Sequence, residues 1–400
     1  NRTRSSMPLV ILLLLFHFCH ISAFFTKYGP INEFKSSALN WSCAVAVDCE
    51  TTTPSGAINN ASTITTAHTT THDMKTPREW LESCEMESGN GAYTVMRCDY
   101  DLRKNEFKLW GEDFHLDRLQ SSIAAIITTS SDFTDSNSRT TSDATISFLL
   151  REAEKQCHEK ISTPTEEGAF LCTFMVTLLW QPRRNNNNDV WVRGHVFSSL
   201  IPVRRISSSP DLLTVLSVRD DNAQLPNRFQ NFPNAKLISW CRQRRPLEET
   251  YKCNNRIGEV ILTRTTKNNH EVEILEGLTT NFFALYPNNV LRTSDTDHVL
   301  GGYARHLVIE AAKRCGLAVE IGPIHLSESE LWQEVFLTSS IRIIAPVGEM
   351  LLSDSESTID SLDDSMDSII WRHDGIGSEN HREPLVWKRI LDEIHKYKAI

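Results

Sequence analysis

The sequence predicts an α+β protein divided into two domains. The chain has 400 residues, of which 40% are hydrophobic and 23% are charged. A chain of this size buries a sizeable core and is usually divided between about two domains. Segments of strand composition alternate with segments of helical periodicity, and residues 202–235, rich in Ser, Pro and Asn, interrupt that pattern. We therefore expect an interdomain linker at 202–235.

The composition argues against two classes of partner. The formal net charge is −10, and Lys and Arg are not gathered with aromatic residues as in a protein that binds the phosphate backbone of a nucleic acid. The ten cysteines form no CxxC pair and show no Cys/His spacing typical of structural zinc. We therefore expect neither a nucleic-acid partner nor a bound metal.

Residues 1–23 have the layout of a secretory signal. Arg2 and Arg4 precede the apolar run PLVILLLLFHFC, and small residues follow it. The run is too short for a comfortable membrane span, so we expect no stable span in the mature protein.

Residues 24–77 are predicted to be a leader. Their first part carries Lys27 and Lys35 against the single acid Glu33, and the SAF junction resembles bipartite plastid presequences. This pattern favours a plastid, with the secretory pathway or secretion as the alternative. Residues 51–76 are rich in Thr and poor in large apolar side chains, which predicts a linker. The folded part is expected to begin near residue 78.

The first domain, predicted at 78–201, begins with a strand, strand, helix unit. The strands are expected at 91–98 and 105–110, and the helix HLDRLQSSIAAII follows with its apolar residues on one face. A second helix is predicted at 143–158. Two more strands are expected at 169–180 and 189–200.

The second domain is predicted at 236–400. Strands are expected at 258–265 and 282–287, and the helix YARHLVIEAAKRC ends at Gly316. LAVEIG and EVFLTSS have strand composition. Residues 353–368 contain six acids and no base, which predicts a solvated, disordered insertion.

Five sequence blocks occur in an order that indicates a function. They are GAYTVMR with FHLDRL, then PNAKLISWCRQR, EVEILEGLTTNFFALYPNNVLRT, LGGYARHLVIEAAKRCGL and EVFLTSSIRIIAPV. From about residue 91 to 347 the chain thereby resembles the class IV aminotransferases, which include branched-chain and D-amino-acid aminotransferases and aminodeoxychorismate lyase. The PNAK block, with SWCRQRRPLEE after it, is most similar to a plant and algal branch.

The resemblance implies a fold, a cofactor and an assembly. The fold would be a two-domain α+β fold with a smaller N-terminal α/β domain and a larger C-terminal domain that binds pyridoxal 5′-phosphate (PLP). The assembly would be a homodimer. The cofactor supplies the electron sink, and the protein needs to provide only a lysine, an acid and a cradle for the phosphate.

The resemblance also assigns roles to individual residues. Lys236 matches the lysine that forms a Schiff base with PLP and then carries the proton between the substrate and the cofactor. Glu276 matches the carboxylate that pairs with the pyridine nitrogen, and Asn281 an asparagine that supports it. Phosphate contacts are expected from a guanidinium, a helix N-terminus and a hydroxyl group. These residues are Arg118, Gly302, Tyr303, Ala304 and Ser340.

Several positions depart from the family pattern. Trp240 and Cys241 occupy the stretch where branched-chain enzymes carry an active-site tyrosine. Ala304 replaces a hydroxyl residue, and Ser339 replaces a glycine. These departures leave the substrate open.

Three functions are therefore compared. The leading one is an aminotransferase that moves the amino group of an amino acid to a 2-oxo acid through a Schiff base on Lys236. A PLP-dependent lyase of the aminodeoxychorismate lyase type would use the same cofactor residues. A catalytically inactive protein with this fold is the third, although it would have no need of Lys236, Glu276 and Arg118.

Overall fold

The computed structural model describes fourteen segments of the chain. They are residues 42–50, 63–70, 81, 91–101, 104, 106–129, 170–182, 190–202, 212–219, 234–251, 256–266, 271–353, 368–373 and 385–398. The predicted signal at 1–23, the predicted helix at 143–158 and nearly all of the acidic segment at 353–368 lie outside them. Among the helices in these segments, none combines the length and the apolar character needed to cross a membrane.

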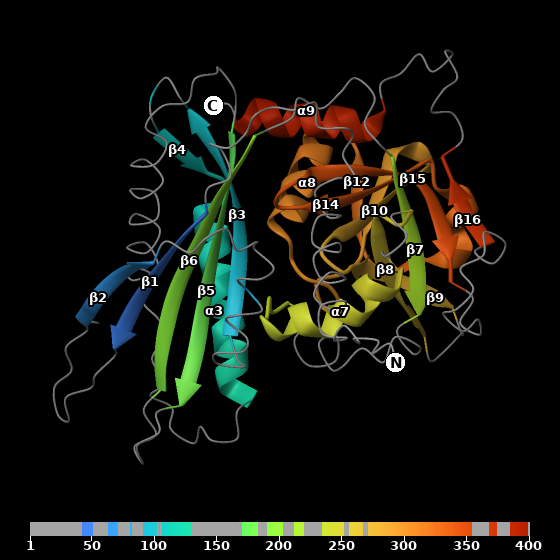
Figure 1. The fold of residues 1–400 in the computed structure, drawn as a ribbon. Helices are drawn as coiled ribbons and strands as arrows, with labels where there is room; N and C mark the ends of the chain where they lie inside the picture. Colours follow the sequence, from blue (N-terminus) through green and yellow to red (C-terminus); the bar gives the residue numbers. More distant parts are fainter. Residues whose placement is uncertain are drawn as a thin grey trace, which may run out of the picture. The chain divides into compact units, whose positions relative to one another are not determined.

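The first sheet is antiparallel and has six strands in the order β2-β1-β6-β5-β3-β4 (Figure 1). Its strands are β1 Ser42–Glu50, β2 Thr63–Thr70, β3 Gly91–Asp101, β4 Glu106–Leu109, β5 Phe170–Pro182 and β6 Val190–Pro202. The helix α3 spans Glu112–Thr129 and contacts β3. The four strands predicted between residues 91 and 200 and the predicted helix HLDRLQSSIAAII are thus confirmed, apart from small shifts in their ends.

Two strands of this sheet correct the prediction that 24–77 is only a leader. β1 pairs with β6, and β2 pairs with β1, so ordered sheet begins well before residue 78. Threonine is β-branched and fits an extended strand well. The Thr-rich composition that suggested a linker is therefore equally suited to β2.

The second sheet is mixed and has ten strands. Its main path is β12-β11-β10-β14-β15-β7-β8-β9-β13, and β16 pairs with β15. The strands are β7 Leu213–Arg219, β8 Glu259–Thr265, β9 Val272–Gly277, β10 Asn281–Tyr286, β11 Val290–Thr293, β12 Ala318–Ile321, β13 Ile324–His325, β14 Glu334–Ser339, β15 Ile343–Leu352 and β16 Ser368–Arg372. The helices are α7 Ser239–Tyr251, α8 Tyr303–Arg314 and α9 Val386–Lys398, with short 3-10 turns η1 Pro287–Asn289 and η2 Leu326–Leu331.

One additional pairing closes part of this sheet on itself. β9 and β10 meet at a single register position, where Glu276 lies opposite Asn281. Because β10 also leads through β14, β15, β7 and β8 back to β9, six strands form a closed ring of pairings. The ring closes where two of the predicted site residues, Glu276 and Asn281, pair.

The strand β7 corrects the predicted interdomain linker at 202–235. β7 lies between β15 and β8 and pairs in parallel with both. Val215, Leu216 and Val218 are at most 3% exposed. The apolar run LTVLSV forms a buried strand. The prediction missed it because the composition was judged over all of 202–235, where Ser, Pro and Asn residues are frequent on both sides of this run.

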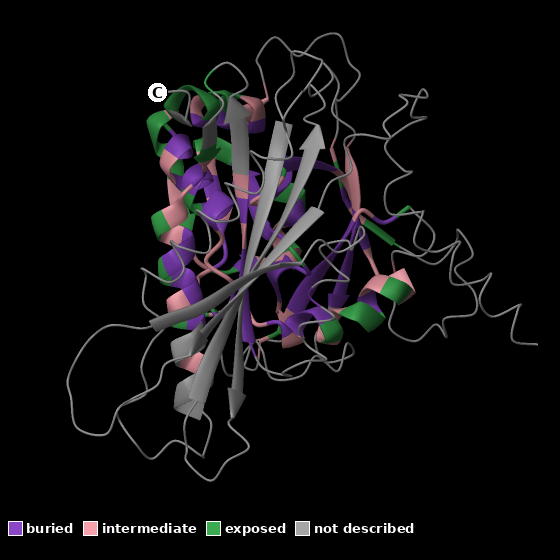
Figure 2. Cartoon of the chain, turned by 60° about the vertical axis from the view of Figure 1, so that its left-hand side comes forward, coloured by how far each residue is buried: buried purple, intermediate pink, exposed green. Residues whose placement is uncertain are grey.

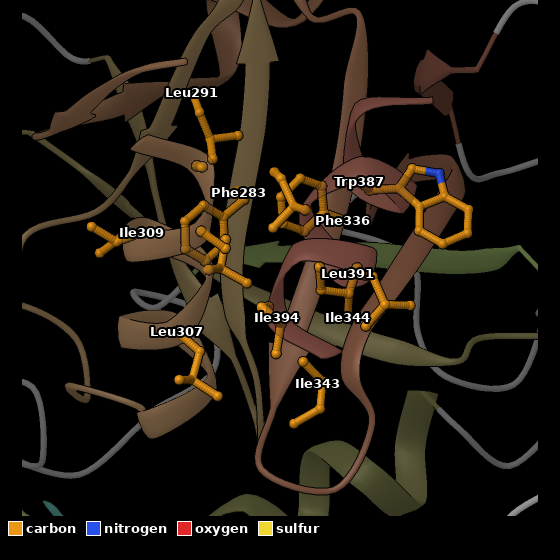
Figure 3. Close-up of a cluster of buried hydrophobic side chains, with 14 of the residues drawn as sticks. Phe283, Leu291, Leu307, Ile309, Phe336, Ile343, Ile344, Trp387, Leu391 and Ile394 are labelled. Carbon is orange, nitrogen blue, oxygen red and sulfur yellow. The ribbon is translucent and has the colours of Figure 1, made fainter. Parts of the chain in front are cut away.

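The largest described core cluster lies between the second sheet and two helices. Phe283 and Phe336 stack with their ring centroids 5.2 Å apart, and side chains from α8 and α9 surround them (Figure 3). β8, β10 and β14 are buried nearly throughout, whereas α7, α8 and α9 alternate between buried and exposed residues (Figure 2). The helices therefore cover this sheet with one apolar stripe each.

Candidate active site

Lys236 is held by backbone contacts to the first strand of the family motif. The amide of Tyr93 donates to the Lys236 carbonyl oxygen at 3.0 Å, and the amide of Ile238 donates to the Gly91 carbonyl oxygen at 2.9 Å. Ala92 and Leu237 form an isolated antiparallel bridge between these contacts. The Lys236 ammonium group, Nζ, lies 5.0 Å from the centroid of the Tyr93 ring. The lysine is thus fixed against β3 through its main chain.

A serine on α3 connects this lysine to the predicted phosphate-binding arginine. Ser122 Oγ accepts a hydrogen bond from the Lys236 amide at 3.0 Å and donates to the Arg118 carbonyl oxygen at 2.8 Å. Ser122 is 1% exposed. The two sequence-predicted residues therefore share one buried support.

Arg118 is a buried cation that neutral groups surround. Its Nη2 donates to Thr94 Oγ1 at 2.8 Å and lies 3.0 Å from His115 Nδ1, while Nη1 lies 3.4 Å from the Gly301 carbonyl oxygen. Within the described segments it makes no ion pair with a carboxylate, and its Nε has no hydrogen-bond partner. Burial lowers the pKa of Arg118 to about 10, and nearby Tyr93 opposes this shift. The guanidinium stays charged near neutral pH, and its buried Nε leaves one hydrogen-bond donor unused among the described residues.

The N-terminus of α8 begins beside Arg118. Gly302 is the residue before the helix and provides no side-chain cap. The main-chain amides of Tyr303 and Ala304 lie in the first turn, where helix amides and the helix dipole favour an anion. The Tyr303 ring turns toward α3, with its centroid 5.3 Å from Phe114 and 5.1 Å from His115. Its side chain anchors the helix, so its backbone remains the part suited to a ligand.

Glu276 is bound to Leu300, the residue that precedes Gly301 and Gly302. Its Oε2 accepts hydrogen bonds from Asn281 Nδ2 at 3.1 Å and from the Leu300 amide at 3.0 Å. Asn281 Nδ2 also donates to the Leu300 carbonyl oxygen at 2.7 Å. Glu276 is 3% exposed and Asn281 is 5% exposed. Two donors therefore fix one oxygen of this buried carboxyl group in place.

The arrangement requires glycine at position 302. A Cβ at that position would lie 2.3 Å from Asn281 Oδ1, much closer than two non-bonded atoms approach, so the Asn281 side chain would have to move. At Gly301 the nearest atom to an added Cβ is Thr296 Cγ2 at 3.7 Å, an ordinary contact. The two glycines of the GG pair therefore have different roles.

The end of β14 brings hydroxyl groups to the same region. Thr338 lies opposite Asn281 in the β10–β14 register, and its buried Oγ1 has no hydrogen-bond partner in the described segments. Ser340 follows two residues later and is half-buried. Ser339 Oγ accepts a hydrogen bond from the Arg342 amide at 3.2 Å. Ser339 therefore supports the turn after β14.

Trp240 and Cys241 contact residues next to the acid and the lysine. Trp240 Nε1 donates to the Leu278 carbonyl oxygen at 2.9 Å, in the turn that follows Glu276. Cys241 Sγ lies 3.8 Å from the Tyr93 hydroxyl oxygen. In the stretch where the sequence shows no equivalent of the tyrosine of branched-chain enzymes, the small side chain of Cys241 thus faces Tyr93.

The residues present fit a ligand with an anionic group at one end and a protonated ring nitrogen at the other. Arg118 and the α8 N-terminus lie on one side of the Leu300–Gly302 segment, and Glu276 is bound to Leu300 itself. The buried, uncompensated guanidinium suits a phosphate, and the buried carboxylate suits a pyridinium. No group of three or more side chains able to hold a metal ion occurs in the segments that the structure describes.

The donors present fit PLP, and comparison with known proteins identifies the family. The model of the family "Amino-transferase class IV" matches residues 91–350. The chain belongs to the class IV aminotransferase family, whose members depend on PLP. No curated protein matches the sequence.

Solved structures have the same fold at low sequence identity. A fold IV transaminase from Curtobacterium pusillum is 17% identical, with a TM-score of 0.51 over 80% of this chain and 94% of the other. A branched-chain aminotransferase from Thermoproteus uzoniensis, solved with norvaline, is 15% identical, with a TM-score of 0.50 over 79% of this chain and 88% of the other. The predicted two-domain α+β class IV fold is confirmed.

Sequence reasoning missed several parts of the site. Thr94, Ser122 and Thr338 contribute buried hydroxyl groups, and Leu300 contributes only its main chain. A backbone donor leaves no signal in residue type. Ser122 could have been found from its spacing, because it follows Arg118 by one helical turn on the same face.

Proposed function

We propose that this protein is an aminotransferase that transfers the amino group of an amino acid to a 2-oxo acid, with Lys236 as the residue that holds PLP covalently. The observation that carries the proposal is the connection of three chemically distinct groups in one site. The backbone of Lys236 is linked through Ser122 to Arg118, Arg118 contacts Gly301, and Leu300 contacts Glu276.

Each group of the protein has a separate task. When bound, PLP stabilises the negative charge that develops on the substrate Cα after it loses a proton. Lys236 Nζ, which lies over the Tyr93 face, would be released when the substrate amine takes its place on the cofactor, and as a free amine it would carry that proton between Cα and the cofactor. Glu276, held in place by Asn281 and Leu300, would pair with the ring nitrogen and keep a proton on it. Arg118 and the amides at the start of α8 would hold the phosphate.

A direct test uses purified protein incubated with PLP. We expect visible absorbance from the bound cofactor, and borohydride reduction should fix the cofactor on the peptide that contains Lys236. Lys236→Ala should abolish both signals, whereas Lys313→Ala, which removes an exposed lysine paired with Glu310, should retain them. Wild-type protein that neither absorbs nor carries fixed cofactor would refute the proposal.

A screen of amino donors and 2-oxo acids on the same preparation then distinguishes transfer from elimination. A transaminase gives ping-pong kinetics and requires an oxo acid acceptor for continued turnover. Release of pyruvate from aminodeoxychorismate without an added oxo acid would instead identify a lyase.

We further propose that the protein acts in a plastid and as a homodimer. The first rests on the leader pattern at residues 1–40, and the second on the family. A fluorescent protein fused after residue 40 should accumulate in plastids, and appearance in the secretory pathway would contradict this. Sedimentation equilibrium should give twice the mass of one chain.

A further inference from the structure

We propose that His115 and Thr94 are positioning residues that hold the Arg118 guanidinium by neutral hydrogen bonds and so leave its full charge for the cofactor phosphate. This inference rests on the proposed function, because it assumes that a phosphate binds beside Arg118. It concerns how the phosphate site is built, and it assigns work to a threonine on β3 and to the histidine that precedes the arginine by one helical turn.

Three side chains form a closed buried triangle. Arg118 Nη2 lies 2.8 Å from Thr94 Oγ1 and 3.0 Å from His115 Nδ1, and these two acceptors lie 2.7 Å from each other. Thr94 and His115 are both 0% exposed, and Arg118 is 9% exposed. The guanidinium contacts both of these neighbours and also the Gly301 carbonyl oxygen, so the protein fixes its orientation before any ligand arrives.

The hydrogen-bond directions determine the state of the histidine. Arginine can only donate, so the contact with Nη2 requires His115 Nδ1 to be an acceptor. The Thr94 hydroxyl oxygen accepts from Arg118 and can direct its own hydrogen toward Nδ1. These directions favour a neutral ring with its proton on Nε2, which is buried and has no hydrogen-bond partner in the described segments. In agreement, burial, Arg118 and Lys236 keep the pKa of His115 well below its usual value.

Neutral partners preserve the charge of the arginine. A carboxylate in place of Thr94 or His115 would orient the guanidinium equally well, but it would cancel the charge that attracts a phosphate. Within the described segments Arg118 has no such carboxylate, and its Nε is unused. A buried, unpaired cation is costly, and a phosphate that accepts two of its hydrogen bonds offsets this cost.

His115 also touches the other half of the phosphate site. Its ring centroid lies 5.1 Å from that of Tyr303, the first residue of α8, with the planes tilted by 54°. Phe114 lies on another side, with centroids 6.0 Å apart. One histidine thus sets the position of Arg118 and packs against the residue whose amide begins the helix.

The test compares uptake of PLP with uptake of pyridoxal, which has the same aldehyde and ring but no phosphate. Both react with Lys236, so their ratio of dissociation constants isolates the phosphate site. The full chain would be titrated as wild type, His115→Phe, His115→Asn, Thr94→Val and Thr94→Ser. Phe and Val remove the acceptor with similar shape, while Asn retains an acceptor near Nδ1 and Ser retains the hydroxyl.

We expect His115→Phe and Thr94→Val to weaken PLP about tenfold, with pyridoxal nearly unchanged, since each loses one hydrogen bond to a charged group. His115→Asn and Thr94→Ser should recover most of the preference for PLP over pyridoxal. Equal weakening of both aldehydes would indicate a merely structural role and overturn the inference. If His115→Phe and Thr94→Val both left the ratio of the two dissociation constants unchanged, the inference would also be overturned, while the proposed function would stand. Wild-type protein that takes up neither aldehyde would overturn both.

Discussion

The side-chain amide oxygen of Asn281 occupies the space that a side chain at Gly302 would need. An added Cβ on Gly302 would lie 2.3 Å from Asn281 Oδ1. The same amide donates to Glu276 and to the Leu300 carbonyl oxygen. One side chain therefore connects the acid proposed for the ring nitrogen with the helix proposed for the phosphate.

The first prediction follows from that contact. Gly302→Ala should displace Asn281 and lower the free energy of unfolding by about 1 to 3 kcal/mol, the usual cost of forcing atoms into a filled site. It should also weaken PLP binding. Gly301→Ala is the matched control, because its Cβ meets only Thr296 Cγ2 at 3.7 Å, and it should change the free energy by less than about 0.5 kcal/mol. Denaturant unfolding and a PLP titration measure both, and equal effects of the two variants would contradict the prediction.

Two adjacent serines on α3 provide the second prediction. Ser122→Ala removes the acceptor of the Lys236 amide and should cost about 1 to 3 kcal/mol of unfolding free energy, because a buried donor loses its partner. Ser121→Ala removes an exposed hydroxyl that makes a similar bond one helical turn back, to the Asp117 carbonyl oxygen at 2.8 Å. It should be nearly neutral. If chemical denaturation showed the same loss of unfolding free energy for Ser121→Ala and Ser122→Ala, the contact with the Lys236 amide would not explain the effect of Ser122→Ala.

Glu276→Gln separates the charge of the acid from its shape. The amide keeps an oxygen that can accept from Asn281 and Leu300, so the protein should fold and still take up PLP. Without the negative charge the ring nitrogen is no longer held protonated, and turnover should fall about 100-fold or more. Steady-state kinetics with the cofactor absorbance measured on the same sample would check this. Activity within a few-fold of wild type would refute the role of Glu276.

The fourth prediction concerns pH and stability. The pKa of His115 is held well below its usual value by burial, then by Arg118 and Lys236. Below about pH 6.5 the unfolded chain takes up a proton on this histidine and the folded chain does not. The free energy of unfolding should therefore fall as the pH drops below about 6.5, by up to about 1.4 kcal/mol per pH unit.

His115→Asn should remove that contribution, whereas His298→Asn, in the turn before α8, should not. Chemical unfolding at about pH 7.5 and pH 5.5 measures the difference between the variants. An identical fall in wild type and His115→Asn would show that other groups cause the loss.

Much of the site could be predicted because its residues lie in contiguous motifs. Arg118 and His115 share a face of an amphipathic helix, and the GG pair precedes a helix whose apolar residues are evenly spaced. The strand β7 could not be recognised from composition, since its short apolar run lies among polar residues. Thr94 and Leu300 act through contacts with residues distant in sequence, and no local pattern indicates such contacts.

The backbone hydrogen bonds of Lys236 have a consequence for the folding of the chain. Its amide bonds to a serine 114 positions earlier, and its carbonyl bonds to β3. Contacts between such distant positions form slowly, because a long loop must close first. The lysine proposed to bind the cofactor therefore reaches its final place only after β3 and α3 have folded. Cofactor uptake would then report that this part of the chain has folded.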